Sequence, residues 1–226
     1  MRLNINKAGC IYFCVVCIFF LLAIKGMKNG KLFGVDNYIF MGYIVLTRIV
    51  YLLIHELSHV FALLCMHLKI REFKIYGFRY EGVTHKWKFS MKEFAFSGYV
   101  IPWLTYDIDT DETYNKFKTA YILSLFAGPI LPFFICFFVS LVGKIFSLPL
   151  GLFVLTFFIN AVLMLLSSFI GNQKTMGDIQ SIIYFSKDAN FSLQLREDLN
   201  LLKENVSERE RNYLDTKNDY KHCTLF

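Results

Sequence analysis

The chain has 226 residues, of which 55% are hydrophobic and 18% aromatic, and its mean hydropathy is +0.44. These values exclude an ordinary soluble globular protein and are typical of a chain embedded in a membrane. The formal net charge of +6 is modest and no basic stripe with interleaved aromatic residues is visible, so we expect a lipid bilayer and no nucleic acid as partner.

Four apolar segments are long enough to cross about 30 Å of hydrocarbon, which takes about 20 residues of helix. The expected spans are residues 8–26, 37–68, 119–143 and 145–172. The first follows Arg2 and Lys7 but lacks a small-residue cleavage site, so we expect a retained anchor rather than a secretory signal. With four spans both termini share one side, which we expect to be the cytosol of a bacterial cell.

The segment between the second and third spans, residues 69–118, is polar and rich in aromatic residues. Three glycines interrupt it, Gly77, Gly82 and Gly98. Short aromatic stretches broken by glycine are typical of β-strands, so this segment is expected to be a small β-rich insert.

A polar tail, residues 181–226, follows the last span. Residues 193–204 and 207–214 are compatible with helices, and Ser207 followed by Glu210 predicts a capping box. The expected fold is an α-helical multi-pass membrane protein with about four transmembrane helices, the β-rich insert and a helical cytosolic tail. Residues 1–180 would form its core.

The second span contains the motif that carries chemistry, since residues 55–59 read His-Glu-Leu-Ser-His. On a helix, residues four apart share a face, so His55 and His59 can bind one Zn²⁺ while Glu56 reaches a metal-bound water. Ionisable residues in a span cost about 2.5 to 3.5 kcal/mol each on insertion scales, which favours a functional site over a chance match. Because zinc lowers the pKa of water to about 7, we expect Glu56 to act as general base.

Catalytic zinc usually takes three protein ligands, so a third ligand must come from elsewhere in the chain. Cys65 stands where the extended motif H-E-x-x-H-x-x-G-x-x-H has its third histidine, and His67 comes two residues too late. Asp178 follows the last long apolar run, where we expect an interrupted helix. Its carboxylate could reach the zinc, or it could simply cap the next helix. Spacing alone leaves both interpretations open.

The first 180 residues resemble the site-2 protease family of intramembrane zinc metallopeptidases. The histidine-glutamate motif lies in the second span as in that family, Gly98-Tyr99-Val100 resembles its Gly-Tyr-Val segment, and Gly128-Pro129 resembles the Gly-Pro of its central span. The resemblance implies that Asp178 completes the zinc site. The Asn-x-x-Pro and Asp-Gly sequences usual in the family are absent around Asp178.

The resemblance also implies hydrolysis of a peptide bond in or near a transmembrane segment of a substrate protein or signal peptide. A substrate helix must unwind first, and adding its backbone to an exposed strand edge would satisfy the freed polar groups. We expect that edge within residues 72–100, with Gly98, Tyr99 and Val100 binding substrate. Asn160 could polarise the oxyanion or hydrogen-bond between helices. The alternatives are an inactive membrane escort and a metal-binding transport component.

Overall fold

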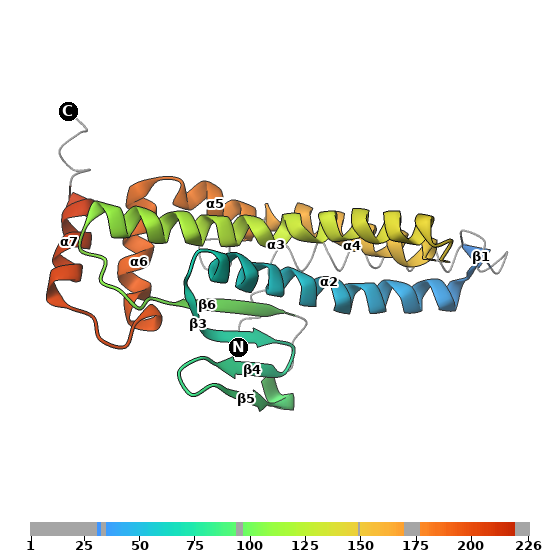
Figure 1. Ribbon diagram of the computed structural model, residues 1–226, viewed down its shortest axis with the longest axis horizontal. Coiled ribbons are helices and arrows are strands. Elements are labelled where there is room, and N and C mark those ends of the chain that lie inside the picture. Colours follow the sequence, from blue (N-terminus) through green and yellow to red (C-terminus); the bar gives the residue numbers. More distant parts are fainter. Residues whose placement is uncertain (1–30, 33–34, 94–96, 149, 170–176, 220–226) are drawn as a thin grey trace, which may run out of the picture. The chain divides into compact units, whose positions relative to one another are not determined.

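The computed structural model describes residues 31–32, 35–93, 97–148, 150–169 and 177–219, and these contain six helices and a small antiparallel sheet (Figure 1). Three of the helices are long and apolar enough to cross a membrane, at Ile39–Cys65, Asp111–Ile145 and Gly151–Ser168. They confirm the expected mostly helical membrane architecture and correspond to the second, third and fourth expected spans. The first expected span, residues 8–26, lies outside the described residues.

The helices are α2 (Asn37–Cys65), α3 (Asp111–Ile145), α4 (Gly151–Ser168), α5 (Asp178–Phe185), α6 (Asp188–Leu202) and α7 (Glu208–Asp219). The strands are β1 (Lys31–Leu32), β2 (Val35–Asp36), β3 (Lys69–Ile75), β4 (Phe78–Glu81), β5 (Lys86–Phe89) and β6 (Gly98–Trp103), with a 3-10 turn at Met91–Glu93. Helix α3 extends beyond the expected span of residues 119–143 and begins at Asp111. Asp111 and Glu112 in its first turn interact favourably with the positive end of the helix dipole.

The chain divides into two compact units, and the first contains the described residues up to His55 and from Pro129 to Gln180. Its core is formed by Tyr51 of α2, Cys136 of α3, and Phe157 and Ala161 of α4. The buried side chain of Asn160 donates hydrogen bonds to Thr47 Oγ1 at 3.0 Å and to Ile44 O at 3.2 Å. Asn160 therefore links α4 to α2, which is the second of the two roles expected for it.

The second unit, Glu56–Gly128 and Ser181–Phe226, contains the four-stranded sheet with strand order β5-β4-β3-β6. Every neighbouring pair is antiparallel, and Phe73, Tyr80 and Trp87 are cross-strand partners on one face. The other face carries charged pairs, Arg79 with Glu72 and Lys88 with Glu81. The insert is therefore a sheet with one apolar and one charged face, as the alternation of its side chains requires.

Helix α2 is joined directly to this sheet by a tight turn at its C-terminal end. Leu68 N–H donates to Leu63 O at 2.9 Å and His67 N–H donates to Leu64 O at 3.0 Å, while His67 has a φ of 59°. This is the Schellman arrangement, in which a left-handed residue satisfies the last carbonyl groups of a helix. The chain enters β3 at the next residue, so the sheet is held close to the last turns of α2.

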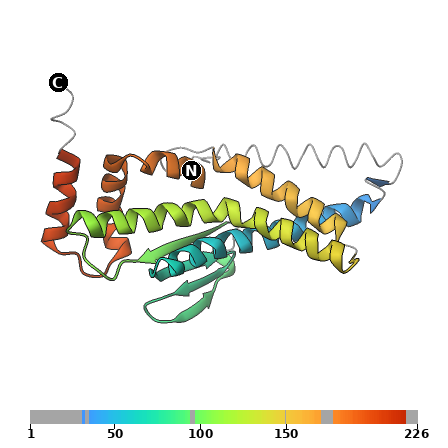
Figure 2. The same cartoon turned by 45° about the horizontal axis from the view of Figure 1, so that its top comes forward.

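The tail helices α6 and α7 pack beside the first turns of α3 within the second unit (Figure 2). Tyr114 stacks edge-on against Phe191 of α6 and Tyr213 of α7, and its hydroxyl donates to Asp188 O at 2.9 Å. The tail is thus packed against the same helix that follows the insert.

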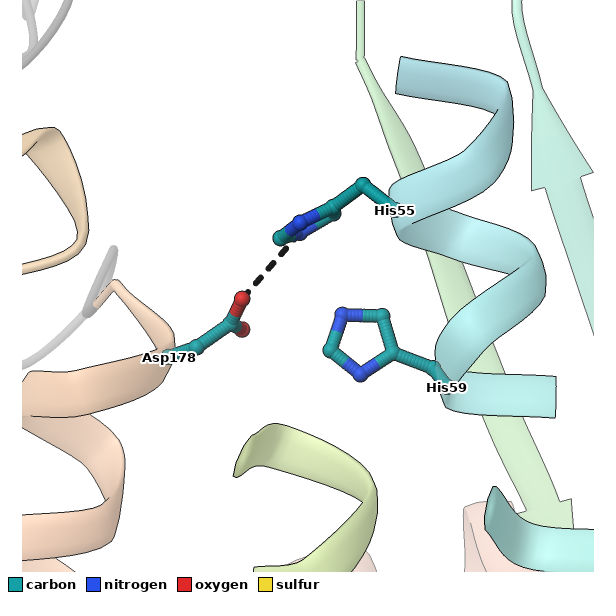
Figure 3. Close-up of side chains that lie close together, drawn as sticks. All are labelled: His55, His59 and Asp178. Carbon is teal, nitrogen blue, oxygen red and sulfur yellow. Dashed lines mark ion pairs between the residues drawn. The ribbon is translucent and has the colours of Figure 1, made fainter. Parts of the chain in front are cut away.

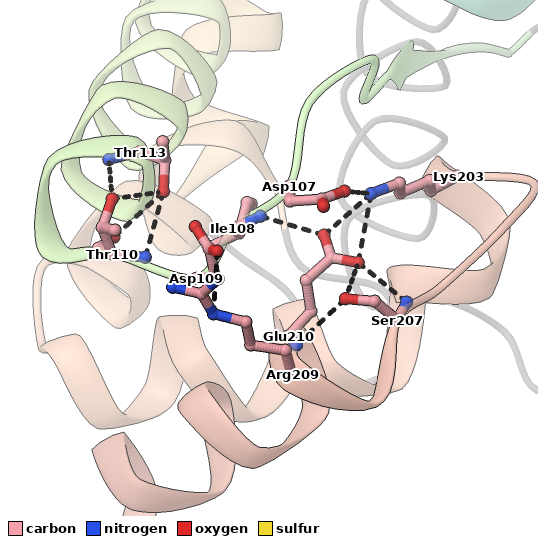
Figure 4. A network of polar contacts seen from close by, with 9 residues as sticks. All are labelled: Asp107, Ile108, Asp109, Thr110, Thr113, Lys203, Ser207, Arg209 and Glu210. Carbon is pink, nitrogen blue, oxygen red and sulfur yellow. Dashed lines mark hydrogen bonds and ion pairs between the residues drawn. The ribbon is translucent and has the colours of Figure 1, made fainter.

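A buried carboxylate, Glu210, fixes the start of α7 (Figure 4). It accepts hydrogen bonds from Ser207 N–H at 3.0 Å, from Ile108 N–H at 2.9 Å and from Lys203 Nζ at 3.0 Å. Ser207 Oγ in turn accepts from Glu210 N–H at 3.2 Å. The reciprocal bonds confirm the predicted capping box. The bond from Ile108 connects the tail to the loop before α3, and Lys203 adds a second connection because it also donates to Asp107.

Candidate metal centre

The two histidines of the motif lie one turn apart on the same side of α2 (Figure 3). His55, Glu56 and His59 are buried, with 7%, 5% and 7% of their surface exposed. Helix α2 runs without interruption through all five motif positions. The four-residue spacing of the two histidines therefore places both imidazoles on one side of the helix.

The orientation of His59 is set by the backbone of α3. His59 Nδ1 lies 2.7 Å from Ser124 O, and Ser124 Oγ donates to His59 O at 3.2 Å. A carbonyl oxygen only accepts hydrogen bonds, so Nδ1 must carry the proton. Nε2 is then left with its lone pair, which is the tautomer that a metal-binding histidine needs.

His55 faces Asp178 within the first unit. The distance from His55 Nε2 to Asp178 Oδ2 is 3.1 Å, and the ring of Tyr51 stacks on His55 with 5.8 Å between centroids. Asp178 is the first residue of α5 and its carboxylate is directed at the imidazole (Figure 3). This orientation favours the ligand interpretation of Asp178 over a role in capping alone.

A close backbone contact sets the position of Asp178. A Cβ atom at Gly177 would lie 2.4 Å from Ser168 O and 2.6 Å from Ser168 Cα. Only a residue without a side chain can therefore bring the start of α5 so close to the end of α4.

One potential ligand atom from each of His55, His59 and Asp178 lies within 4.8 Å of the others. Two imidazoles and a carboxylate are a donor set that suits zinc. With metal–ligand distances of about 2.0–2.1 Å, two ligand atoms of a tetrahedral zinc lie about 3.3 Å apart, close to the separation between His55 and Asp178. Cys65 and His67 are exposed and do not belong to the group. The residues present fit a zinc ion.

Glu56, the residue predicted as general base, packs against the first residue of β6. A Cβ atom at Gly98 would lie 2.6 Å from Cγ and Cδ of Glu56. Glycine at this position therefore allows the strand to approach the carboxylate directly. The contact places the start of the Gly98-Tyr99-Val100 segment beside Glu56.

The profile of peptidase family M50 matches residues 43–206, which include most of α2, the four-stranded sheet and α3 to α6. The chain belongs to peptidase family M50. Members of family M50 are intramembrane zinc metallopeptidases, so the match confirms the resemblance to the site-2 proteases. Neither a search of curated proteins nor a search of solved structures found a match.

The remaining residues predicted to bind substrate take different positions. Val100 lines a cavity beside β6, whereas the Tyr99 hydroxyl donates to the Glu72 carboxylate on the charged face of the sheet. Asn160 makes the interhelical bonds described above, and its substrate role stays a prediction. Sequence reasoning missed the contributions of Ser124 and Gly177, because one acts through a backbone oxygen and the other through a close backbone approach.

Proposed function

We propose that this M50 peptidase is a zinc-dependent intramembrane endopeptidase that hydrolyses a peptide bond in or near a transmembrane segment of a substrate protein or signal peptide. The observation that carries this proposal is the group of His55, His59 and Asp178 with buried Glu56 beside it on α2. A purely structural metal site has no need of an additional carboxylate next to its ligands.

In this mechanism His55, His59 and Asp178 hold the zinc, and Ser124 O keeps His59 in its metal-binding tautomer. When bound, zinc acts as a Lewis acid and makes water a nucleophile near neutral pH. Glu56 takes a proton from the attacking water and delivers it to the amide nitrogen as the C–N bond breaks. Burial of Glu56 limits exchange of that proton with bulk solvent.

The free edge of β6 offers a binding place for unwound substrate. In the described part of the chain β6 is the last strand of its sheet, and Tyr76 N–H donates across to Ser97 O at 3.4 Å. Bonded positions alternate along an antiparallel pair, so Gly98 and Val100 direct their N–H and C=O groups away from β3. Pro102, two residues on, has no N–H to offer. Substrate can therefore pair with a short stretch that begins beside Glu56.

We also propose that the protein resides in a bacterial cell membrane with both termini in the cytosol, and that residues 1–180 form the peptidase core. Reporter fusions at the C-terminus test the orientation. Activity of a reporter that folds only in the cytosol supports it, and activity of a reporter that works only outside the cytosol contradicts it.

Purified protein in detergent, incubated with a panel of fluorescent transmembrane peptides, tests the function. We expect cleavage within or at the end of the apolar segment, loss of cleavage on zinc chelation, and recovery when zinc is restored. Peptide binding without cleavage by the zinc-loaded protein would favour the escort alternative. Metal flux into proteoliposomes without peptide cleavage would favour a transport component.

A further inference from the structure

A cavity of about 120 Å³ lies in the second unit beside the free edge of β6, where that strand meets α3 and α6. Three aromatic side chains, Phe117, Tyr121 and Phe191, form much of its apolar wall. Two polar residues of α6, Gln194 and Asp198, also line it. The cavity therefore combines an apolar wall with one acidic group.

The acidic group is available for a cation. Gln194 Nε2 donates to Asp198 Oδ2 at 2.7 Å, and among the described residues no cationic side chain pairs with Asp198. Two cations lie nearby, and each has another partner. Lys118, with its Nζ 5.9 Å from the centre of the Phe191 ring, is paired with Asp188, and Arg71 of β3 donates to Asn200 O at 3.4 Å. A carboxylate on a mainly apolar wall favours a ligand with an apolar stem and a cationic head.

The cavity is next to the part of α3 where charged residues give way to apolar ones. Charged side chains occur in the first turns of α3 up to Lys118, whereas residues 119–143 carry none. Phe117 and Tyr121 lie on either side of this boundary, so the cavity is at the level where a span leaves the hydrocarbon. Lysine and arginine are the residues that commonly flank the cytoplasmic ends of transmembrane segments.

The cavity also continues the edge proposed for substrate binding. Gly98 contacts Glu56 at the start of β6, while Val100 and Pro102 line the cavity further along the same strand. Beyond them, Leu104 N–H donates to Leu202 O at 2.9 Å, so α6 closes the end of the edge. A substrate strand that pairs with β6 would bring a side chain to the cavity about two to four residues from the bond beside Glu56.

We propose that this cavity is a subsite for a lysine or arginine side chain of the substrate. The stem of that side chain lies against the aromatic wall and its head pairs with Asp198. The inference rests on the proposed peptidase function and specifies its substrate class as transmembrane segments with a basic residue two to four positions from the cleaved bond.

The test uses transmembrane peptides in which lysine, norleucine or glutamate is moved through the four positions on each side of the cleaved bond. For wild-type protein in detergent, we expect lysine at one position two to four residues away to raise kcat/KM about fivefold over norleucine, with glutamate worse than both. Asp198→Asn should remove this preference and Asp198→Lys should reverse it in favour of glutamate. Glu197→Gln removes a charge from the exposed side of the same helix, and this variant should retain the preference for lysine.

Binding to Glu56→Gln protein, measured by fluorescence anisotropy with the same peptides, separates this inference from the function. Cleavage that depends on Glu56, without any lysine preference or with a preference that persists in Asp198→Asn, overturns the subsite and leaves the peptidase standing. If wild type cleaves no peptide, the proposed peptidase function fails. The binding data then still decide whether the cavity is a basic subsite. A lysine preference that requires Asp198 supports a basic subsite, and equal binding of lysine and norleucine overturns it.

Discussion

Gly98 and Glu56 are packed so closely that a Cβ atom at position 98 would lie 2.6 Å from both Cγ and Cδ of Glu56. The two residues come from different elements, since Gly98 begins β6 and Glu56 lies within α2. A carboxylate at the end of a flexible side chain can move away from such a clash. The absence of a side chain at Gly98 therefore determines where the proposed base points.

We expect Gly98→Ala to lower kcat at least tenfold, because the added methyl group displaces the Glu56 carboxylate from the reacting water. Zinc content and thermal unfolding should stay unchanged, since the clash is with a side chain rather than with backbone. Gly42→Ala in α2 is the matched control, because nothing lies within 4 Å of the added atom. Peptide cleavage by Gly98→Ala at the wild-type rate would show that the contact has no catalytic role.

Gly177→Ala should weaken zinc binding, whereas Gly98→Ala should lower kcat. The added Cβ would meet Ser168 O at 2.4 Å, and backbone atoms cannot move aside as a side chain does. The start of α5 must shift, and Asp178 moves with it away from His55. We expect zinc affinity, measured by competition with a chelating dye, to fall about tenfold or more. Gly151→Ala, which has open space around it, is the control, and equal affinities for the two variants would contradict this account.

The local features of the site could be predicted from sequence. His55, Glu56 and His59 follow from helical spacing, and the bonds of Ser207 and Glu210 follow from a four-residue pattern. The third ligand could not be decided, because it depends on how the chain returns to α2 after α4. Ser124 gave no signal, since its carbonyl oxygen is common to every residue type. The close contact of Gly98 with Glu56 likewise depends on the tertiary arrangement of a strand and a helix.

Glu210→Ala should destabilise the second unit by about 3 kcal/mol. Glu210 is fully buried, and its removal leaves Ile108 N–H without its acceptor and weakens the pairing of Lys203. The two tryptophans, Trp87 and Trp103, both lie in this unit's sheet, so intrinsic fluorescence reports its unfolding. Asp215→Asn breaks an exposed pair with Arg196 and should cost less than about 1 kcal/mol. Equal losses in both variants would contradict the role of Glu210.

Lys203 makes part of this stability depend on pH. Burial lowers the pKa of Lys203, but its hydrogen bonds to Asp107 and Glu210 raise it more, so the folded pKa lies above the ordinary value of 10.5. Its contribution is therefore fully present below that ordinary pKa, which applies to the unfolded chain, and is lost as pH rises through the folded pKa. Thermal unfolding between pH 8 and pH 11 should show this loss in wild type and lack it in Lys203→Met. Identical pH dependence of the two proteins would rule out this contribution of Lys203.

The measurement that tests the central claim most directly combines zinc content with peptide cleavage for wild type, Glu56→Gln and Asp178→Ala. We predict one zinc per chain in wild type and in Glu56→Gln, with cleavage by Glu56→Gln reduced by about 10² to 10⁴ because the general base is lost. Asp178→Ala should bind zinc more weakly. A wild-type protein that binds no zinc, or a Glu56→Gln variant that cleaves as fast as wild type, would contradict the account.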